Sequence, residues 1–283
     1  MASGTWEDVV WLAGFLGRAQ LEPIVEAAKP KLNDKDIDAF WHGHAESKAL
    51  VQKLPVEKLS EVGEAPLSKQ FAFREQEVRA TDEFRQVYGD RQVRFVTVKP
   101  DRLAAFQFQV RAGGRELSKD PSLVLDECLP KEFRLDADIE ILGNPGTGAF
   151  QIGVTTDFLG PVLGSIRIDR ERNAVELPFI PNRNWLQVAH FQNRYWVHNG
   201  YHRIYSLMAL GVDKIPCIVF EADAPIEVVG NVLDLQSFGK LCAMPRPPLL
   251  KDYLSKAALK LPRRRHRHML VANVQLGNEQ VPI

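Results

Sequence analysis

Cysteine is scarce in this chain, and the cysteines that it has are not paired in the sequence. Of 283 residues only three are cysteine, at Cys128, Cys217 and Cys242, and none belongs to a C-x-x-C pair. An odd, widely spaced set is not typical of a disulfide framework or of a zinc ribbon. The sequence therefore indicates a reducing compartment, and we expect the protein in the cytoplasm.

Long apolar runs are absent as well. The short apolar run 11–16 follows Glu7 and Asp8 and no basic segment precedes it, so it does not have the form of a signal peptide. No other run approaches the ~20 residues that a membrane-spanning helix needs. We expect no membrane partner.

The chain also lacks an excess of charge of either sign, because Lys+Arg and Asp+Glu both number 36. The local distribution is uneven. Between Lys240 and His268 nine Lys or Arg residues stand against one acid, Asp252. Clustered arginine is typical of a contact with a nucleic-acid backbone. A solvated segment, or one paired with the protein's own acids, explains the cluster equally well. The candidate contacts are Arg263, Arg264, Arg265 and Arg267.

Three consecutive regions are predicted along the chain, and together they give an α+β fold. Residues 1–69 form a helical N-terminal region, with one helix opened by a Thr5–Asp8 capping box and another beginning after Asn33-Asp34. Residues 70–221 form a mixed, β-rich domain. Residues 222–283 form a helical tail, in which 249–261 has helical spacing of leucine and alanine.

Strands are predicted in the middle region because short runs there alternate apolar and polar residues between Gly, Pro, Asn or Asp. These runs are 93–98, 105–110, 149–154, 164–168 and 174–180.

The most informative stretch is 185–220, which predicts strands at 185–191 and 194–198, a loop at Asn199-Gly200, a helix from His202 to Gly211 and a strand at 215–220. A glycine loop that opens a helix favours anions, because the first backbone N–H groups lack partners and the helix dipole is positive there. Gly200 would let a phosphate approach the backbone, and Arg203 would add a guanidinium. We expect 194–198 and 215–220 to lie parallel in one sheet.

This stretch resembles the phosphate-binding core of the ParB/sulfiredoxin superfamily. The resemblance rests on Gly200-Tyr201-His202-Arg203 as a G-x-[HR]-R loop, on the Gly211 cap and on Ile215-Pro216 at the start of the next strand. It spans 185–220, with a weaker echo from about 92. It implies that Asn199, Gly200, Tyr201, His202 and Arg203 hold nucleotide phosphates, with a nucleoside triphosphate and Mg²⁺ as candidate cofactors and nucleotide hydrolysis or phosphotransfer as the candidate reactions.

Departures from the superfamily leave other functions open. Tyr201 stands where sulfiredoxins carry their catalytic cysteine, which argues against sulfinic acid reduction. No catalytic residue is identified, so enzymatic activity is left undecided. One alternative is a non-catalytic adaptor that retains the fold. Another is a DNA-associated nuclease, for which the metal-binding candidates would be Asp136, Asp138 and Asp157.

Overall fold

The chain forms two compact units. The computed structural model describes residues 5–113, 117–131, 137–144, 149–156, 162–163, 167–169, 174–176, 179–180, 185–230, 232–265 and 268–275. The main unit combines Met1–Lys131 with Asn184–Arg264, and the second unit combines Glu132–Arg183 with Arg265–Ile283. These units interleave along the chain, so they do not coincide with the three consecutive regions expected from the sequence.

The main unit contains all the described helices. They are α1 (Arg18–Ala28), α2 (Asp34–Val51), α3 (Ala72–Arg79), α4 (Asp82–Tyr88), α5 (Pro121–Cys128), α6 (Tyr201–Ala209), α7 (Pro225–Val229) and α8 (Leu235–Ala243), with short 3-10 turns η1 (Ala13–Phe15), η2 (Lys29–Lys31), η3 (Lys69–Phe71), η4 (Pro100–Arg102) and η6 (Leu250–Leu254). Its strands are β1 (Trp6–Trp11), β2 (Ala65–Pro66), β3 (Val93–Val98), β4 (Gln109–Arg111), β11 (Gln187–Phe191), β12 (Arg194–Asn199), β13 (Ile215–Glu221) and β14 (Leu259–Arg264).

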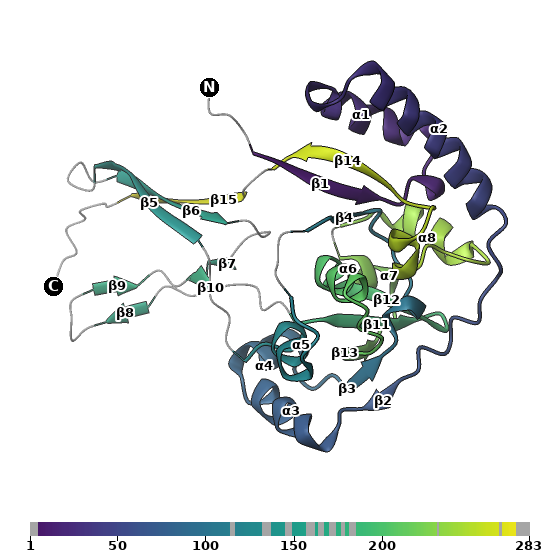
Figure 1. Ribbon diagram of the computed structural model, residues 1–283. Coiled ribbons are helices and arrows are strands. Elements are labelled where there is room, and N and C mark those ends of the chain that lie inside the picture. The colour runs from purple at the N-terminus through teal and green to yellow at the C-terminus, as the bar shows by residue number, and fades with distance from the viewer. Residues whose placement is uncertain are drawn as a thin grey trace. The chain divides into compact units, whose positions relative to one another are not determined.

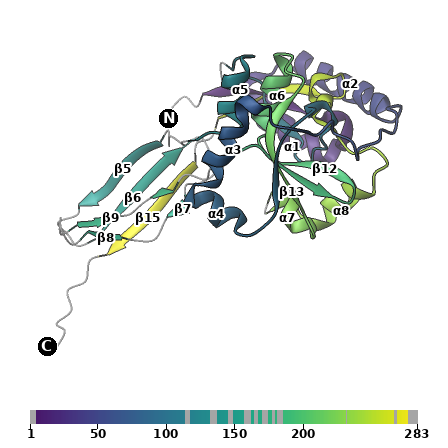
Figure 2. The ribbon, with the colours of Figure 1, turned by 90° about the horizontal axis from the view of Figure 1, so that it is seen from below.

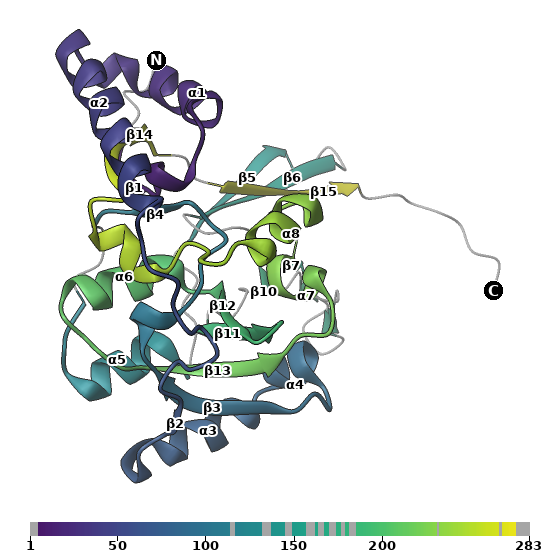
Figure 3. The same ribbon diagram turned by 90° about the vertical axis from the view of Figure 1, so that its right-hand side faces the viewer.

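A five-stranded sheet forms the centre of the main unit, in the order β12-β11-β13-β3-β2 (Figure 3). From Ile215 to Phe220 strand β13 is buried throughout, as its unbroken apolar run leads one to expect of an inner strand. The prediction that 194–198 and 215–220 share a sheet is confirmed. The predicted parallel orientation is wrong. Strand β11 lies between the two, antiparallel to β12 and parallel to β13, so β12 and β13 run in opposite directions.

Local signals set the connections around this sheet. Gln192 and Asn193 both have positive φ, 49° and 58°, which is the geometry of a two-residue hairpin turn between β11 and β12. Helix α6 ends just before Gly211, which the sequence predicted as its C-terminal cap. Gly211 has φ 84°, its N–H donates to the Met208 carbonyl at 2.8 Å, and the Val212 N–H donates to that of Leu207 at 3.0 Å.

A smaller sheet in the order β14-β1-β4 carries α1 and α2, both of which contact β14 (Figure 1). Helix α2 begins at Asp34, one residue earlier than predicted, with the Asn33 side chain accepting from the Asp36 N–H. The predicted helix from Thr5 is wrong, because Trp6–Trp11 is a strand. Strand β1 has a neighbour on each edge, and these two hydrogen-bonded ladders outweigh the local helical spacing.

The predicted helical tail is also wrong beyond α8. Within 249–261 the chain forms the short 3-10 turn η6 and then enters β14, whose residues pair with β1. The Asp252 carboxylate holds the turn, since it accepts from the Leu249 N–H at 2.8 Å and pairs with Arg246 at 2.7 Å. Leu261, expected on a helix face, is instead buried in the small core beneath α1 and α2.

The second unit is described only as strands, and Figure 2 shows three of them, β5, β6 and β15, side by side. Its strands are β5 (Ala137–Asn144), β6 (Ala149–Thr156), β7 (Val162–Leu163), β8 (Arg167–Asp169), β9 (Ala174–Glu176), β10 (Phe179–Ile180) and β15 (His268–Gln275). The strand predicted at 149–154 is confirmed within β6. Of the strands predicted at 164–168 and 174–180, residues 167–168 lie in β8, residues 174–176 in β9 and residues 179–180 in β10. The other residues of these two predictions lie outside the described part of the chain.

The fold is therefore a mixture of helices and sheets, and the α+β class predicted from the sequence is confirmed at that level. The strand predicted at 93–98 is β3 with the same bounds, whereas of 105–110 only the last two residues belong to a strand, β4. Among the residues described, no helix is long and apolar enough to cross a membrane. The more specific resemblance, to the ParB/sulfiredoxin superfamily, stays a prediction.

Candidate functional site

The predicted phosphate loop lies between β12 and α6, with Gly200 as the residue before the helix. Gly200 has φ 110°, a backbone conformation that residues with a Cβ rarely adopt. A Cβ at this position would lie 3.1 Å from Leu186 Cγ and 3.4 Å from Arg203 Nη2. Atoms of the protein itself therefore lie beside Gly200, in the space that the sequence analysis gave to a phosphate.

Arg203 is turned inward. Its residue surface is only 7% exposed, and its Nη1 donates to the backbone carbonyl of Glu127 at 2.5 Å. Glu127 is in the last turn of α5, where carbonyl groups lack a partner within the helix and the helix dipole attracts a cation. The guanidinium thus stabilises the C-terminal end of α5.

Asn199 and Tyr201 also bond to neighbouring backbone. The Asn199 amide donates to the Trp185 carbonyl at 3.2 Å. The Tyr201 hydroxyl accepts from the Phe106 N–H at 2.9 Å, and Tyr201 is 3% exposed. Burial raises the pKa of the Tyr201 phenol, so the hydroxyl is neutral at physiological pH. Both side chains join β12 and α6 to other parts of the core.

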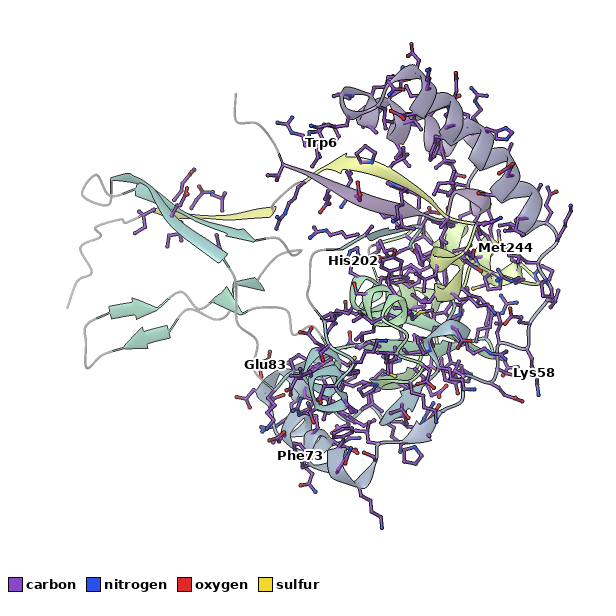
Figure 4. The ribbon with its side chains drawn as sticks, viewed as in Figure 1. Trp6, Lys58, Phe73, Glu83, His202 and Met244 are labelled. Carbon is purple, nitrogen blue, oxygen red and sulfur yellow. The ribbon has the colours of Figure 1, made fainter. Side chains whose placement is uncertain are left out.

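His202 is the member of the predicted set that reaches the surface, on the side of α6 that faces β4 (Figure 4). Its Nδ1 accepts from the backbone N–H of Arg111 at 3.0 Å. Neighbouring protein atoms desolvate the ring, and the guanidinium charges of Arg111 and Arg263 repel a proton. Together they lower the His202 pKa to about 4, against the opposing effect of Glu7. The neutral ring therefore carries its proton on Nε2, which is a donor.

Two arginines on the strands that flank β1 share one carboxylate beside His202. Arg263 on β14 stands opposite Glu7 on β1, and its Nη2 lies 2.6 Å from Glu7 Oε1. Arg111 on β4 brings its Nε to 3.3 Å from Glu7 Oε2. We call Arg111, His202 and Arg263, with Glu7, the basic cluster. Because His202 is neutral, the two guanidiniums and the one carboxylate give the basic cluster a net charge of +1.

Donors within the basic cluster are only partly used. Arg263 Nη1 donates to Gln109 Oε1 at 2.9 Å, in addition to its bonds with Glu7. Arg111 Nε is buried and finds no hydrogen-bond partner among the described residues, because the contact with Glu7 is an ion pair without hydrogen-bond geometry. Unsatisfied polar groups of this kind are uncommon in folded proteins and call for an explanation.

The remaining predicted residues are dispersed. Arg264 is exposed at the end of β14, next to Arg263, whereas Arg265 belongs to the second unit. Asp138 falls in β5, and Arg267, Asp136 and Asp157 lie outside the described residues. Within the described part of the chain no group of three or more His, Cys, Asp or Glu side chains could hold a metal ion.

Comparison with protein-family models, with curated proteins and with solved structures finds no match to this chain. The resemblance to the ParB/sulfiredoxin superfamily therefore depends on the sequence pattern of 185–220 and its weaker echo from about 92.

Sequence reasoning missed Glu7 and Arg111, although it singled out Arg263 and His202. Glu7 was placed on a helix and Arg111 follows the predicted strand 105–110, so nothing local associates either residue with the 199–203 loop. The useful signal would have been a pairing of the first strand with 259–264, which puts Glu7 opposite Arg263.

Proposed function

We propose that this protein binds the phosphate groups of a nucleotide or of a nucleic-acid end at the basic cluster. The observation that carries the proposal is that Arg111 and Arg263 share the single carboxylate of Glu7 next to His202, at the start of α6. Relative to the sequence-based hypothesis, the ligand is the same. Its main contacts move from Arg203, which bonds to backbone, to Arg111 and Arg263.

The chemistry of the cluster suits a phosphate. A guanidinium offers two N–H groups at the spacing of two phosphate oxygens, and such charge-assisted bonds are stronger than neutral ones. The neutral His202 ring supplies one more donor without the cost of bringing a third positive charge into the cluster. An anion bound here would offset the net positive charge of the cluster.

A nucleoside triphosphate fits this proposal through its phosphates, which Arg111 and Arg263 would contact directly. Glu7 is the cluster's only carboxylate and is already paired with both arginines, so the cluster does not provide a ligand set for Mg²⁺. No general base is identified next to it. The proposal is therefore one of binding, with no reaction assigned.

A second candidate, a non-catalytic adaptor, is supported by a different observation. Asn199, Tyr201, His202 and Arg203 each bond to the backbone of another segment. A loop whose polar side chains all join parts of the core is what an adaptor that retained the fold and lost its ligand would contain.

The two candidates are separated by binding titrations with three probes: pyrophosphate, ATP and a 5′-phosphorylated oligonucleotide. We expect Arg111→Gln and Arg263→Gln each to weaken binding about tenfold, as loss of one charge-assisted contact does. Arg85→Gln is the matched control, because this exposed arginine lies on α4 and pairs with Asp82. For the oligonucleotide, each cluster variant should also reduce the slope of log affinity against log salt by about one unit.

Pyrophosphate and ATP report on a nucleotide ligand, and the oligonucleotide reports on a nucleic-acid end. If neither cluster variant differs from Arg85→Gln, or if no probe binds to the native protein, the phosphate proposal fails and the adaptor is favoured. Melting curves of the ligand-free variants show whether each still folds.

A further inference from the structure

A cavity of about 260 Å³ lies elsewhere in the main unit and shares no residue with the basic cluster. It opens where η3, the start of α5 and the turn after α6 meet strands β3 and β13. Its volume is close to the lower end of the range of ligand pockets, which begins at about 300 Å³. A ligand for this cavity must therefore be small.

Part of the cavity wall is apolar. Phe71 comes from η3, Val124 from α5 and Val212 from the turn after α6, and Pro121 and Pro216 complete this part. Val124 is anchored in the main core with 4% of its surface exposed. Such a wall stabilises the hydrocarbon part of a ligand by removing it from water, at about 25 cal/mol per Å² of apolar surface.

Two exposed lysines and one exposed aspartate are also among the residues that line the cavity. Lys119 precedes α5 and Lys214 precedes β13, and in the described part of the chain neither forms an ion pair. The Lys119 ammonium lies over the Gly211 turn, 3.8 Å from where a Cβ at Gly211 would be. Asp213 is the only acid in the lining, so the cavity carries a net charge of +1.

We propose that this cavity binds a small organic carboxylate with an apolar aromatic or aliphatic body. The carboxylate would lie between the Lys119 and Lys214 ammonium groups, and the body would pack on Phe71, Val124 and Val212. A free inorganic anion suits the cavity less well, because the apolar wall offers nothing in exchange for its hydration. A neutral hydrocarbon leaves both ammonium groups unpaired.

The test is a titration of the ¹⁵N-labelled full chain with benzoate, followed by amide chemical shifts at constant ionic strength. We expect the signals of Val124, Gly211 and Val212 to move together and to define one dissociation constant. Benzyl alcohol lacks the charge and acetate lacks the ring, so both should bind more weakly than benzoate.

Variants of the three charged residues separate a built site from general charge effects. Replacing Lys119 and Lys214 together by alanine should weaken benzoate about fivefold or more, since each exposed pair contributes about twofold to fivefold. The matched control replaces the exposed Lys240 and Lys256 by alanine and should leave affinity unchanged. Asp213→Asn should tighten binding about twofold, because it removes the one opposing charge.

Three outcomes would overturn the proposal: benzyl alcohol binding as tightly as benzoate, the control pair weakening binding as much as the cavity pair, or benzoate leaving the signals of the cavity residues in place. Because the lysines and Asp213 are exposed, these variants are expected to fold. None of these results depends on whether phosphate binds at the basic cluster.

Discussion

Replacing Arg203 by alanine should destabilise the protein and leave intact the phosphate binding that we propose for the basic cluster. The change leaves the Glu127 carbonyl at the end of α5 without the donor that now lies 2.5 Å away. A hydrogen bond to a charged group contributes about 1.5–3 kcal/mol. The aliphatic stem of this buried side chain adds packing that alanine cannot replace. We therefore expect the free energy of unfolding to fall by about 2–4 kcal/mol.

The assay is urea unfolding followed by tryptophan fluorescence, together with the ATP and pyrophosphate titrations. Arg85→Ala is the control, because this side chain is 65% exposed and its loss should cost less than about 0.5 kcal/mol. Arg203→Lys should fall between the two, since an ammonium retains the charge and not the planar fork. The reasoning is refuted if Arg203→Ala unfolds at the same urea concentration as the native protein and no longer binds phosphate. Arg203 would then be a ligand of the phosphate.

Three further changes test the same loop. Gly200→Ala should lower the free energy of unfolding by about 1–3 kcal/mol more than Gly113→Ala does. The φ angles at the two sites are alike, 110° and 106°, and only a Cβ at Gly200 would meet Leu186. Equal melting temperatures of the two variants would contradict this. Tyr201→Phe should lower the free energy of unfolding by about 1–3 kcal/mol, because it leaves the buried Phe106 N–H without an acceptor. Tyr205→Phe is the control, and equal losses in urea unfolding would argue against this hydrogen bond. His202 has a folded pKa of about 4, below its ordinary 6.5, so the unfolded chain takes up this proton first and stability falls as pH drops from 6.5 through 4. His202→Asn, which keeps an acceptor for the Arg111 N–H, should reduce that fall between pH 7 and pH 4.5, and a fall of unchanged size would show that other groups cause it.

Much of the central sheet could be predicted from the sequence, because short-range chemistry specifies it. The β11–β12 hairpin follows from a two-residue turn at Gln192 and Asn193, and the end of α6 follows from Gly211, which adopts the left-handed backbone of a helix cap. Strand β13 follows from the unbroken apolar run 215–220. Each of these signals depends on neighbours within a few residues.

The strand of 6–11 and the partners of the loop residues depended on the tertiary structure. Helical spacing in the first segment was overruled by pairing with strands that begin about 100 and 250 residues later in the chain. Arg203 looked like a phosphate ligand because its sequence context cannot reveal that the last turn of α5 ends beside it. Arg111 and Arg263 come together with His202 only through the ladder that joins β1 to β4 and β14. The sequence alone determined a glycine loop that opens a helix and an arginine in its first turn. The tertiary structure decided which arginines remain close to the surface beside that loop, because burial and long-range pairing are properties of the assembled chain.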